Sequence, residues 1–359
     1  MKYRYVKPFL FLFLVTAALS FRHIPVSRFD ATSGATVTTS LNGNSLYHRH
    51  PGTQLEQLKL EVEGEVEGAG EAVFKGIYPH EVVVKQTRMN TDSSVEFIGA
   101  YRYWGYSLFD ILQPFVLKKK NAEVFKPAID AYIVVTNDKG DSVTFSWSEI
   151  FHSANHHQII IATGISPVKP YRKDVNYPIP ESWKLVAGAD LYAQRYLDSP
   201  TKICIKSFDR KDYPITRNMA PLFSPNPVIN INGNASVQIP LIEDRSRYQT
   251  FHSTFYGMGM GFHPIPKFEG IPLREVMPKG FNLFDPHWIQ KGLVCIASAD
   301  GYRAVFSYSE LFNRNDQTMP LLAVPDNPDE GGYYRIFLPT DFFADRSVKA
   351  VSEIYLFMP

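Results

Sequence analysis

Short runs of apolar or alternating residues, separated by turn residues, make up most of this chain. Leu60-Glu-Val-Glu-Gly64 alternates apolar and acidic positions and ends in glycine, which is typical of a half-buried strand. The segments 131–135 (AYIVV), 158–163 (QIIIAT) and 293–298 (LVCIAS) are short and apolar, which predicts strands in sheet interiors. Helical periodicity appears only over short stretches. The pattern therefore predicts an α+β fold that is rich in strand and has short helices.

The pattern of one region is repeated in a later region. Four blocks occur in the same order in both, and the matched pairs are 60–64 with 229–233, 105–112 with 270–277, 140–151 with 301–312, and the segments that begin at Trp183 and Tyr334. The third pair, GDSVTFSWSEIF and GYRAVFSYSELF, predicts a strand, a serine cap and a short helix in each copy. We predict two diverged copies of one module, over residues 55–209 and 228–359, with a proline-rich linker over 210–227.

The first twenty residues differ from the rest. Basic residues at the start precede the apolar run Pro8–Leu19, and the small residues Ala18 and Ser20 lie at its end. This layout predicts a secretory signal peptide over residues 1–20, followed by a Ser-, Thr-, Asn- and His-rich linker over 21–54. The run is shorter than the roughly 20 residues of a membrane span, although an uncleaved membrane anchor is the alternative. We expect an exported protein, periplasmic or secreted, without a span in the mature chain.

Composition and charge narrow the classes of partner. The chain has 359 residues, enough for about two domains, and a net charge of +1. A net charge this close to zero produces no overall electrostatic attraction for nucleic acid. We therefore expect a small-molecule ligand and no nucleic acid. Cys204 and Cys295 cannot form a disulfide framework, and both lie in apolar runs. We predict buried free thiols, with a single bridge as the alternative.

The ordered blocks resemble the molybdopterin-binding domain of the sulfite oxidase family, in two tandem copies. The resemblance consists of a strand that ends in glycine, a G-x-x-L-x-D/E-x-L segment, a strand that leads into a serine-capped helix, and a closing strand. The second copy is the better match, because it keeps Pro339 and the SVKAVSEI run. The resemblance implies a molybdopterin-like ligand near the loops at 86–104 and 250–264, and an exported redox partner if the protein is catalytic.

The cysteine of the family does not have a counterpart here. The family's enzymes bind molybdenum through the cofactor and one cysteine upstream of the G-x-x-L-x-D-x-L block. The stretches 82–104 and 249–268 contain no cysteine, so a soft ligand of the metal would be missing. The sequence therefore favours a ligand-binding protein over a catalyst, and whether the chain is an enzyme stays open. The alternative is a molybdopterin-dependent oxidoreductase with a non-cysteine metal environment.

A segment at 251–263 combines histidine, methionine and glycine where the second copy should hold that cysteine. Its glycines allow the backbone to approach a ligand closely, and imidazole with thioether would suit copper. A His/Met copper-binding protein is therefore a further alternative, with the candidate metal ligands His252, Met258, Met260 and His263. The candidate cofactor-binding residues are His252, Tyr256, Gly257, Gly259, His263 and Arg346. Packing between the repeats is the structural alternative for the whole loop.

Arg346 and its counterpart Arg195 each follow an aspartate by five residues. An arginine at this position could bind a pterin phosphate with two hydrogen bonds. It could equally pair with its own aspartate, Asp341 or Asp190, and stabilise the turn between them. The sequence leaves both alternatives open.

Two further features have structural alternatives. Glu149 and Glu310 each follow a serine by three residues, which predicts helix caps. His152 and His156 are spaced to share a helix face and could hold a metal ion if the helix continues. The alternative for the histidines is a solvated helix end.

Overall fold

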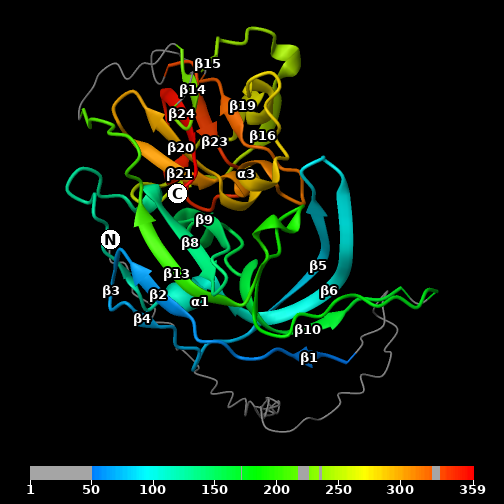
Figure 1. The fold of residues 1–359 in the computed structure, drawn as a ribbon. Helices are drawn as coiled ribbons and strands as arrows, with labels where there is room; N and C mark the ends of the chain where they lie inside the picture. The colour runs from blue at the N-terminus through cyan, green and yellow to red at the C-terminus, as the bar shows by residue number, and fades with distance from the viewer. Residues whose placement is uncertain (1–50, 171, 217–225, 234–236, 326–331) are drawn as a thin grey trace, which may run out of the picture. The chain divides into compact units, whose positions relative to one another are not determined.

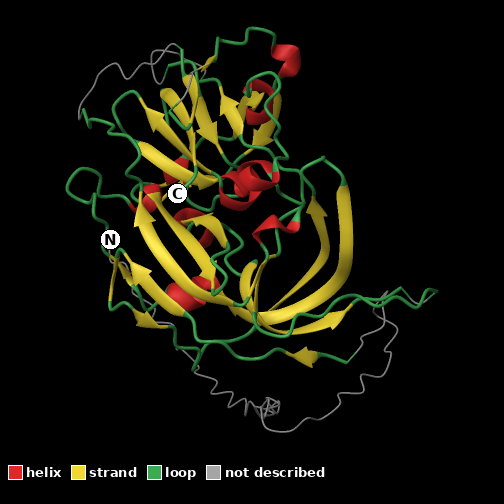
Figure 2. Cartoon of the chain, viewed as in Figure 1, coloured by secondary structure: helices red, strands yellow, loops and turns green. Residues whose placement is uncertain are grey.

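Strands dominate the architecture, as the computed structural model in Figure 2 shows, with 42% strand and 13% helix. The structure describes residues 51–359 except 171, 217–225, 234–236 and 326–331, all within the compact unit 39–359. The predicted α+β class is wrong, because the fold is mostly β. The α-helices that the structure describes have only five or six residues each, too short to cover the face of a sheet. They are α1 (Leu108–Leu112), α2 (Trp147–Phe151), α3 (Pro286–Lys291) and α4 (Tyr308–Phe312).

Two five-stranded sheets have the same strand order, β4-β2-β13-β8-β9 and β15-β14-β24-β20-β21. In each sheet the second and third strands pair parallel and the other neighbours pair antiparallel. The first sheet contains β2 (Glu61–Gly64), β4 (Gly70–Glu71), β8 (Ala131–Asn137), β9 (Ser142–Ser146) and β13 (Pro200–Ser207). The second contains β14 (Val228–Ile231), β15 (Val237–Gln238), β20 (Leu293–Ser298), β21 (Arg303–Ser307) and β24 (Val351–Phe357). Figure 1 shows β8 beside β13 and β20 beside β24.

A second pair of sheets accompanies these two. The larger one has the order β12-β11-β10-β6-β5, and β1 pairs with β10 at its side. Its strands are β1 (Thr53–Gln54), β5 (His80–Met89), β6 (Val95–Ser107), β10 (Ile159–Pro167), β11 (Lys184–Ala187) and β12 (Leu197–Asp198). The smaller one has the order β16-β19-β22-β23, with β16 (Gln249–His252), β19 (Lys267–Pro272), β22 (Leu321–Ala323) and β23 (Arg335–Phe337). Strands β5, β6, β10 and β11 thus correspond in order to β16, β19, β22 and β23.

Short elements complete the described chain. The two-stranded sheets are β3 (Val66–Glu67) with β7 (Val116–Leu117) and β17 (Phe255–Gly257) with β18 (Gly261–His263). The 3-10 helices are η1 (Ala128–Asp130), η2 (Ala193–Arg195), η3 (Arg245–Arg247), η4 (Leu273–Val276) and η6 (Ala344–Arg346). No helix in the described part of the chain is long and apolar enough to span a membrane.

Serine residues begin three of the α-helices. The side chains of Ser107, Ser146 and Ser307 each accept a hydrogen bond from the backbone N–H three residues later. Ser307 and Glu310 form the complete capping box that the sequence predicts. In the first half of the chain Ser146 caps α2, but the Glu149 carboxylate binds Arg195 and Ser307 instead. The predicted serine caps of α2 and α4 are therefore confirmed. Of the two predicted capping glutamates, Glu310 completes a capping box, whereas the Glu149 side chain contacts residues far away in the sequence.

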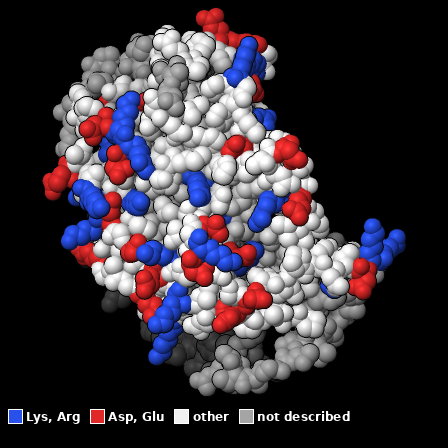
Figure 3. Space-filling view, viewed as in Figure 1, with Lys and Arg blue, Asp and Glu red and all other residues white. Residues whose placement is uncertain are grey.

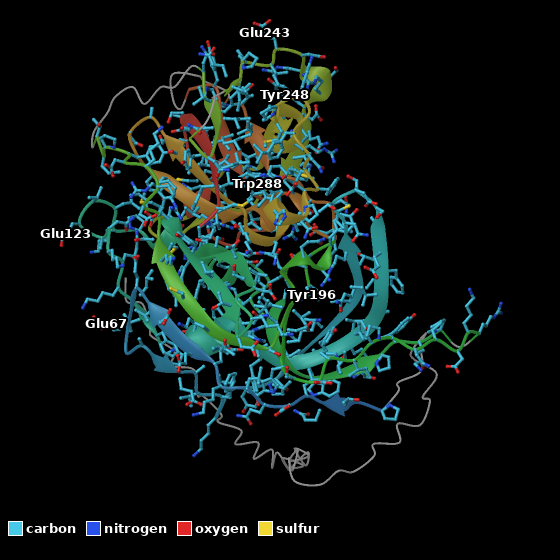
Figure 4. The ribbon with its side chains drawn as sticks, viewed as in Figure 1. Glu67, Glu123, Tyr196, Glu243, Tyr248 and Trp288 are labelled. Carbon is cyan, nitrogen blue, oxygen red and sulfur yellow. The ribbon has the colours of Figure 1, made fainter. Side chains whose placement is uncertain are left out.

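Buried apolar residues form a core in each half and a cluster between the two five-stranded sheets. In that cluster Tyr132 of β8 meets Phe357 of β24 edge to face, with ring centroids 5.9 Å apart. Cys295 is buried in the same cluster and Cys204 is partly buried, and both are free thiols, as predicted. Nearby, α3 packs against η2, and Figure 4 labels Trp288 on α3 and Tyr196 directly after η2. The two halves therefore share a buried interface.

Several predicted features fall outside the described residues. These are the signal peptide over 1–20, most of the linker over 21–54 and the middle of the linker over 210–227. The described surface carries charges of both signs, and Figure 3 shows Lys and Arg interspersed with Asp and Glu on the visible face.

Candidate functional site

The segment at 250–264 contains the end of β16 and, over residues 255–263, a short hairpin. Strands β17 and β18 pair antiparallel, with Phe255 opposite His263 and Gly257 opposite Gly261. Gly261 has a φ of +72°, a left-handed conformation that glycine adopts without strain. Met258 and Met260 are exposed at the tip. The glycines of this segment therefore form the turn that places the hairpin beside two cavities.

Six of the eight predicted site residues line one of two cavities. His252 and Tyr256 line the smaller one, of about 120 Å³. Gly257, Gly259, Met260 and His263 line the larger one, of about 400 Å³.

Neither cavity has all four predicted copper ligands in its wall. His252 and His263 line different cavities, and Met258 lines neither. The copper hypothesis stays a prediction, without a common site for its four ligands.

Arg335, at the start of β23, is the most informative side chain in the larger cavity. Its Nε donates a hydrogen bond of 2.8 Å to Ser347 Oγ, and its guanidinium lies 4.6 Å from the ring centroid of Phe255. Within the described residues no carboxylate forms an ion pair with it. Burial accordingly lowers the pKa of Arg335 to about 10. The cavity wall thus contains a desolvated cation that lacks an anionic partner among the residues the structure describes.

Other polar groups of the larger cavity are arranged around this cation. The hydroxyl of Ser298 is buried and, among the described residues, has no hydrogen-bond partner. Asp345 accepts a hydrogen bond of 3.0 Å from the backbone N–H of Met258, and Asp300 accepts one of 3.0 Å from the backbone N–H of Tyr302. Both carboxylates are therefore used to hold turns at the edge of the cavity.

Arg346 lines neither cavity and is fully buried. Its guanidinium binds Asp341 at 2.5 and 2.9 Å and Glu310 at 2.8 and 2.9 Å. The fifth donated hydrogen bond, of 3.2 Å, goes to Ser146 Oγ. Its role in cofactor binding stays a prediction, and these contacts support the structural alternative.

The histidines after α2 do not share a helix face, because the helix ends at Phe151. His152 is buried beside Phe343, and burial, with Arg346 and His156 nearby, lowers the pKa of His152 to about 4. His156 instead stacks on Phe109, with ring centroids 4.3 Å apart. The predicted pair therefore lacks the continuing helix that would place both imidazoles on one face.

The donors around the hairpin do not fit a molybdenum centre of the kind that the family resemblance implies. The thiols of Cys204 and Cys295 lie on β13 and β20 and line neither cavity. Burial raises the pKa of both thiols, which disfavours the thiolate that would bind a metal. No protein-family model matches this chain, and no curated protein matches it either. The resemblance stays a prediction, and the functional interpretation is based on the larger cavity.

The sequence indicated the hairpin but not Arg335. The segment 251–263, dense in Gly, His and Met, contributes residues to the wall of the larger cavity, and whether it binds a ligand stays a prediction. Arg335 lies in the matched block that begins at Tyr334, but its importance comes from tertiary packing against Phe255. Spacing alone does not show that this arginine is partly buried and pairs with no carboxylate among the described residues.

Proposed function

We propose that this chain is an exported ligand-binding protein, and that its larger cavity holds the anionic oxygen group of a small molecule. The single observation that carries the proposal is Arg335, a partly buried cation in the wall of this cavity that pairs with no carboxylate among the described residues. Guanidinium presents several N–H donors in a planar fork, which matches a carboxylate, phosphate or sulfate group. An anion at this position would supply the partner that the described protein residues do not.

The charge of Arg335, which no carboxylate among the described residues neutralises, has an energetic cost. A cation that is removed from water without an anion or hydrogen-bond acceptors loses solvation free energy. For Arg335 that loss appears as the lowered pKa, whose cause is burial. Packing against the faces of Phe255 and Phe268 recovers only part of it, since cation–π contacts contribute about 0.5–2 kcal/mol. A bound anion would recover more, because charge-assisted hydrogen bonds are stronger.

The size and lining of the cavity limit the ligand. Its volume of about 400 Å³ lies in the range typical of small-molecule sites. Phe255, Ile265 and Met260 provide apolar walls, and the Ser298 hydroxyl provides a second polar contact. Asp300 and Asp345 at the edge would repel a ligand with several separated negative charges. We therefore expect one anionic group on an otherwise neutral or cationic small molecule.

The proposed duplication and the family resemblance are both compatible with this site, but the proposed site does not depend on either of them. The identical strand orders of the two five-stranded sheets support a duplication. The hairpin at 255–263 lies in the region where the resemblance would place the cofactor, and molybdopterin carries a phosphate. In that case Arg335, and not Arg346, is the arginine that we propose to bind it.

Thermal denaturation with added anions tests the proposal. We would heat the protein with sodium phosphate, sulfate or acetate, and compare wild type with Arg335→Met and the exposed control Arg274→Met. A ligand at a hundred times its Kd stabilises the folded state by about 2.7 kcal/mol. We expect at least one anion to raise the Tm of wild type and Arg274→Met, but not that of Arg335→Met. Equal shifts in all three proteins, or no shift in any, would contradict the proposal.

A further inference from the structure

A cluster of histidine and aspartate lies away from the cavity, in the first half of the chain. His80 begins β5, Asp110 lies in α1 and His157 precedes β10. Their ligand-type atoms all lie within 4.8 Å of one another. We propose that these three side chains bind one divalent transition-metal ion of the zinc type.

The distances suit a small ion. His80 Nε2 lies 2.9 Å from Asp110 Oδ2, and His157 Nδ1 lies 3.5 Å from the same oxygen. Ligand atoms around a tetrahedral ion with bonds of about 2.0–2.1 Å lie roughly 3.3 Å apart. The two observed separations bracket that value. Small side-chain rotations would therefore place the three atoms around one ion.

The donor set also fits the ion class. Two imidazole nitrogens and one carboxylate oxygen are typical of catalytic zinc sites and of non-haem iron sites. The three side chains are partly exposed, at 28% for His80, 25% for Asp110 and 43% for His157. Partial exposure leaves a path for the ion and a coordination position for water or another ligand.

Neighbouring groups orient the cluster. Ser107 Oγ donates a hydrogen bond of 2.6 Å to Asp110 Oδ2 while it caps α1. This contact fixes the carboxylate toward the histidines, in the way that outer contacts orient metal ligands.

The second half provides an internal comparison. In the matched sequence blocks Asp110 corresponds to Glu275, which pairs with Arg247 at 3.1 Å. At this position the second half has an ion pair with a guanidinium, where the first half has a carboxylate beside two imidazoles. A guanidinium cannot donate a lone pair to a metal ion, so the second half lacks the nitrogen ligands of the first. Glu275 therefore provides a matched control position.

Hydrogen-bonded packing without metal is the competing interpretation. The rings of His80 and His157 stack with centroids 3.7 Å apart and an interplanar angle of 8°. Such a stack beside one carboxylate could be a purely structural contact. The two interpretations differ in whether the protein takes up an ion stoichiometrically.

Calorimetric titration with zinc separates them. We would treat the tag-free protein with a chelator, remove the chelator, and titrate ZnCl₂ into wild type, His80→Gln, His157→Gln and the control Glu275→Gln. We expect one zinc ion per chain in wild type and in Glu275→Gln. Each histidine variant should bind at least about tenfold more weakly. Circular dichroism would verify that each variant is folded.

Cobalt substitution provides an independent readout. Cobalt(II) in a four-coordinate site with nitrogen and oxygen ligands has intense visible bands, which the wild type should show and His157→Gln should lose. Absence of saturable zinc binding by wild type would overturn the proposal. Zinc affinity and cobalt bands that persist in both histidine variants would also overturn it. The ligand cavity around Arg335 involves none of these residues, so either result leaves the proposed function independently testable.

Discussion

Arg195 Nη1 donates a hydrogen bond of 3.1 Å to Oγ of Ser307, which lies 112 residues later in the chain. The reciprocal contact is also present, because Arg346 Nη1 donates a hydrogen bond of 3.2 Å to Ser146 Oγ. Each arginine lies in one half and its serine in the other. The halves therefore exchange equivalent hydrogen bonds across a buried interface, next to the caps of α2 and α4.

Removal of Arg195 should destabilise the protein strongly. Its guanidinium pairs with Asp190 and Glu149, and Asp190 is buried. Arg195→Met would leave both carboxylates without their cation, which costs about 3–5 kcal/mol for a buried pair. Urea denaturation measures this loss. The control Arg247→Met removes an exposed pair with Glu275 and should cost less than about 1 kcal/mol. Equal losses in the two variants would contradict a special role for the interface.

Gly270 allows β19 to approach β22 closely. A Cβ atom at this position would lie 2.1 Å from the backbone oxygen of Leu322, and one at the matched Gly105 would lie 2.0 Å from that of Ile161. We expect Gly270→Ala to lower the free energy of unfolding by about 1–3 kcal/mol or more, because the strands must separate. Gly259→Ala is the control, since its Cβ would meet no atom within 4 Å. If both variants unfolded at the same urea concentration, the close approach would not matter for stability.

His152 should make stability depend on pH. Burial, with Arg346 and His156 nearby, lowers the pKa of His152 from 6.5 to about 4. Between these values the unfolded state binds more protons than the folded state, so stability falls as the pH falls from about 6.5 toward 4. We expect the loss between about pH 7 and pH 5 to be on the order of 2 kcal/mol smaller in His152→Leu than in wild type. Urea denaturation at both pH values measures it, and parallel losses would show that His152 does not contribute.

Local structure was largely predictable from the sequence. The apolar runs at 131–135 and 293–298 lie in β8 and β20 as predicted, and the S-x-x-E spacing of Ser307 and Glu310 marks a capping box. The fold class was not predictable in the same way. Segments with helical spacing, such as Leu108–Leu112, end after little more than one turn, so they add little helix to a mostly β fold.

The sites depend on contacts that spacing does not reveal. The histidine–aspartate cluster draws on three separate segments, with His80 in β5, Asp110 in α1 and His157 just before β10. Only the antiparallel pairing of β6 with both β5 and β10 brings these segments together. The pairing of Arg195 with Asp190 is one of the two alternatives that the sequence leaves open, whereas the burial of Arg195 and its contact with Ser307 follow only from the fold. The fold, and not the local sequence, brings Arg335 beside the hairpin, so that both line the larger cavity.

The affinity of one anion for the Arg335 cavity is the most direct test of the proposed function. Isothermal titration calorimetry would use the anion that stabilises wild type most, with Arg335→Met and Arg274→Met titrated in parallel. Loss of a hydrogen bond to a charged group costs about 1.5–3 kcal/mol, and every 1.4 kcal/mol is a tenfold change in Kd. We predict one site per chain, a Kd at least about tenfold higher in Arg335→Met, and an unchanged Kd in Arg274→Met. The same Kd in all three proteins would contradict the assignment of the site.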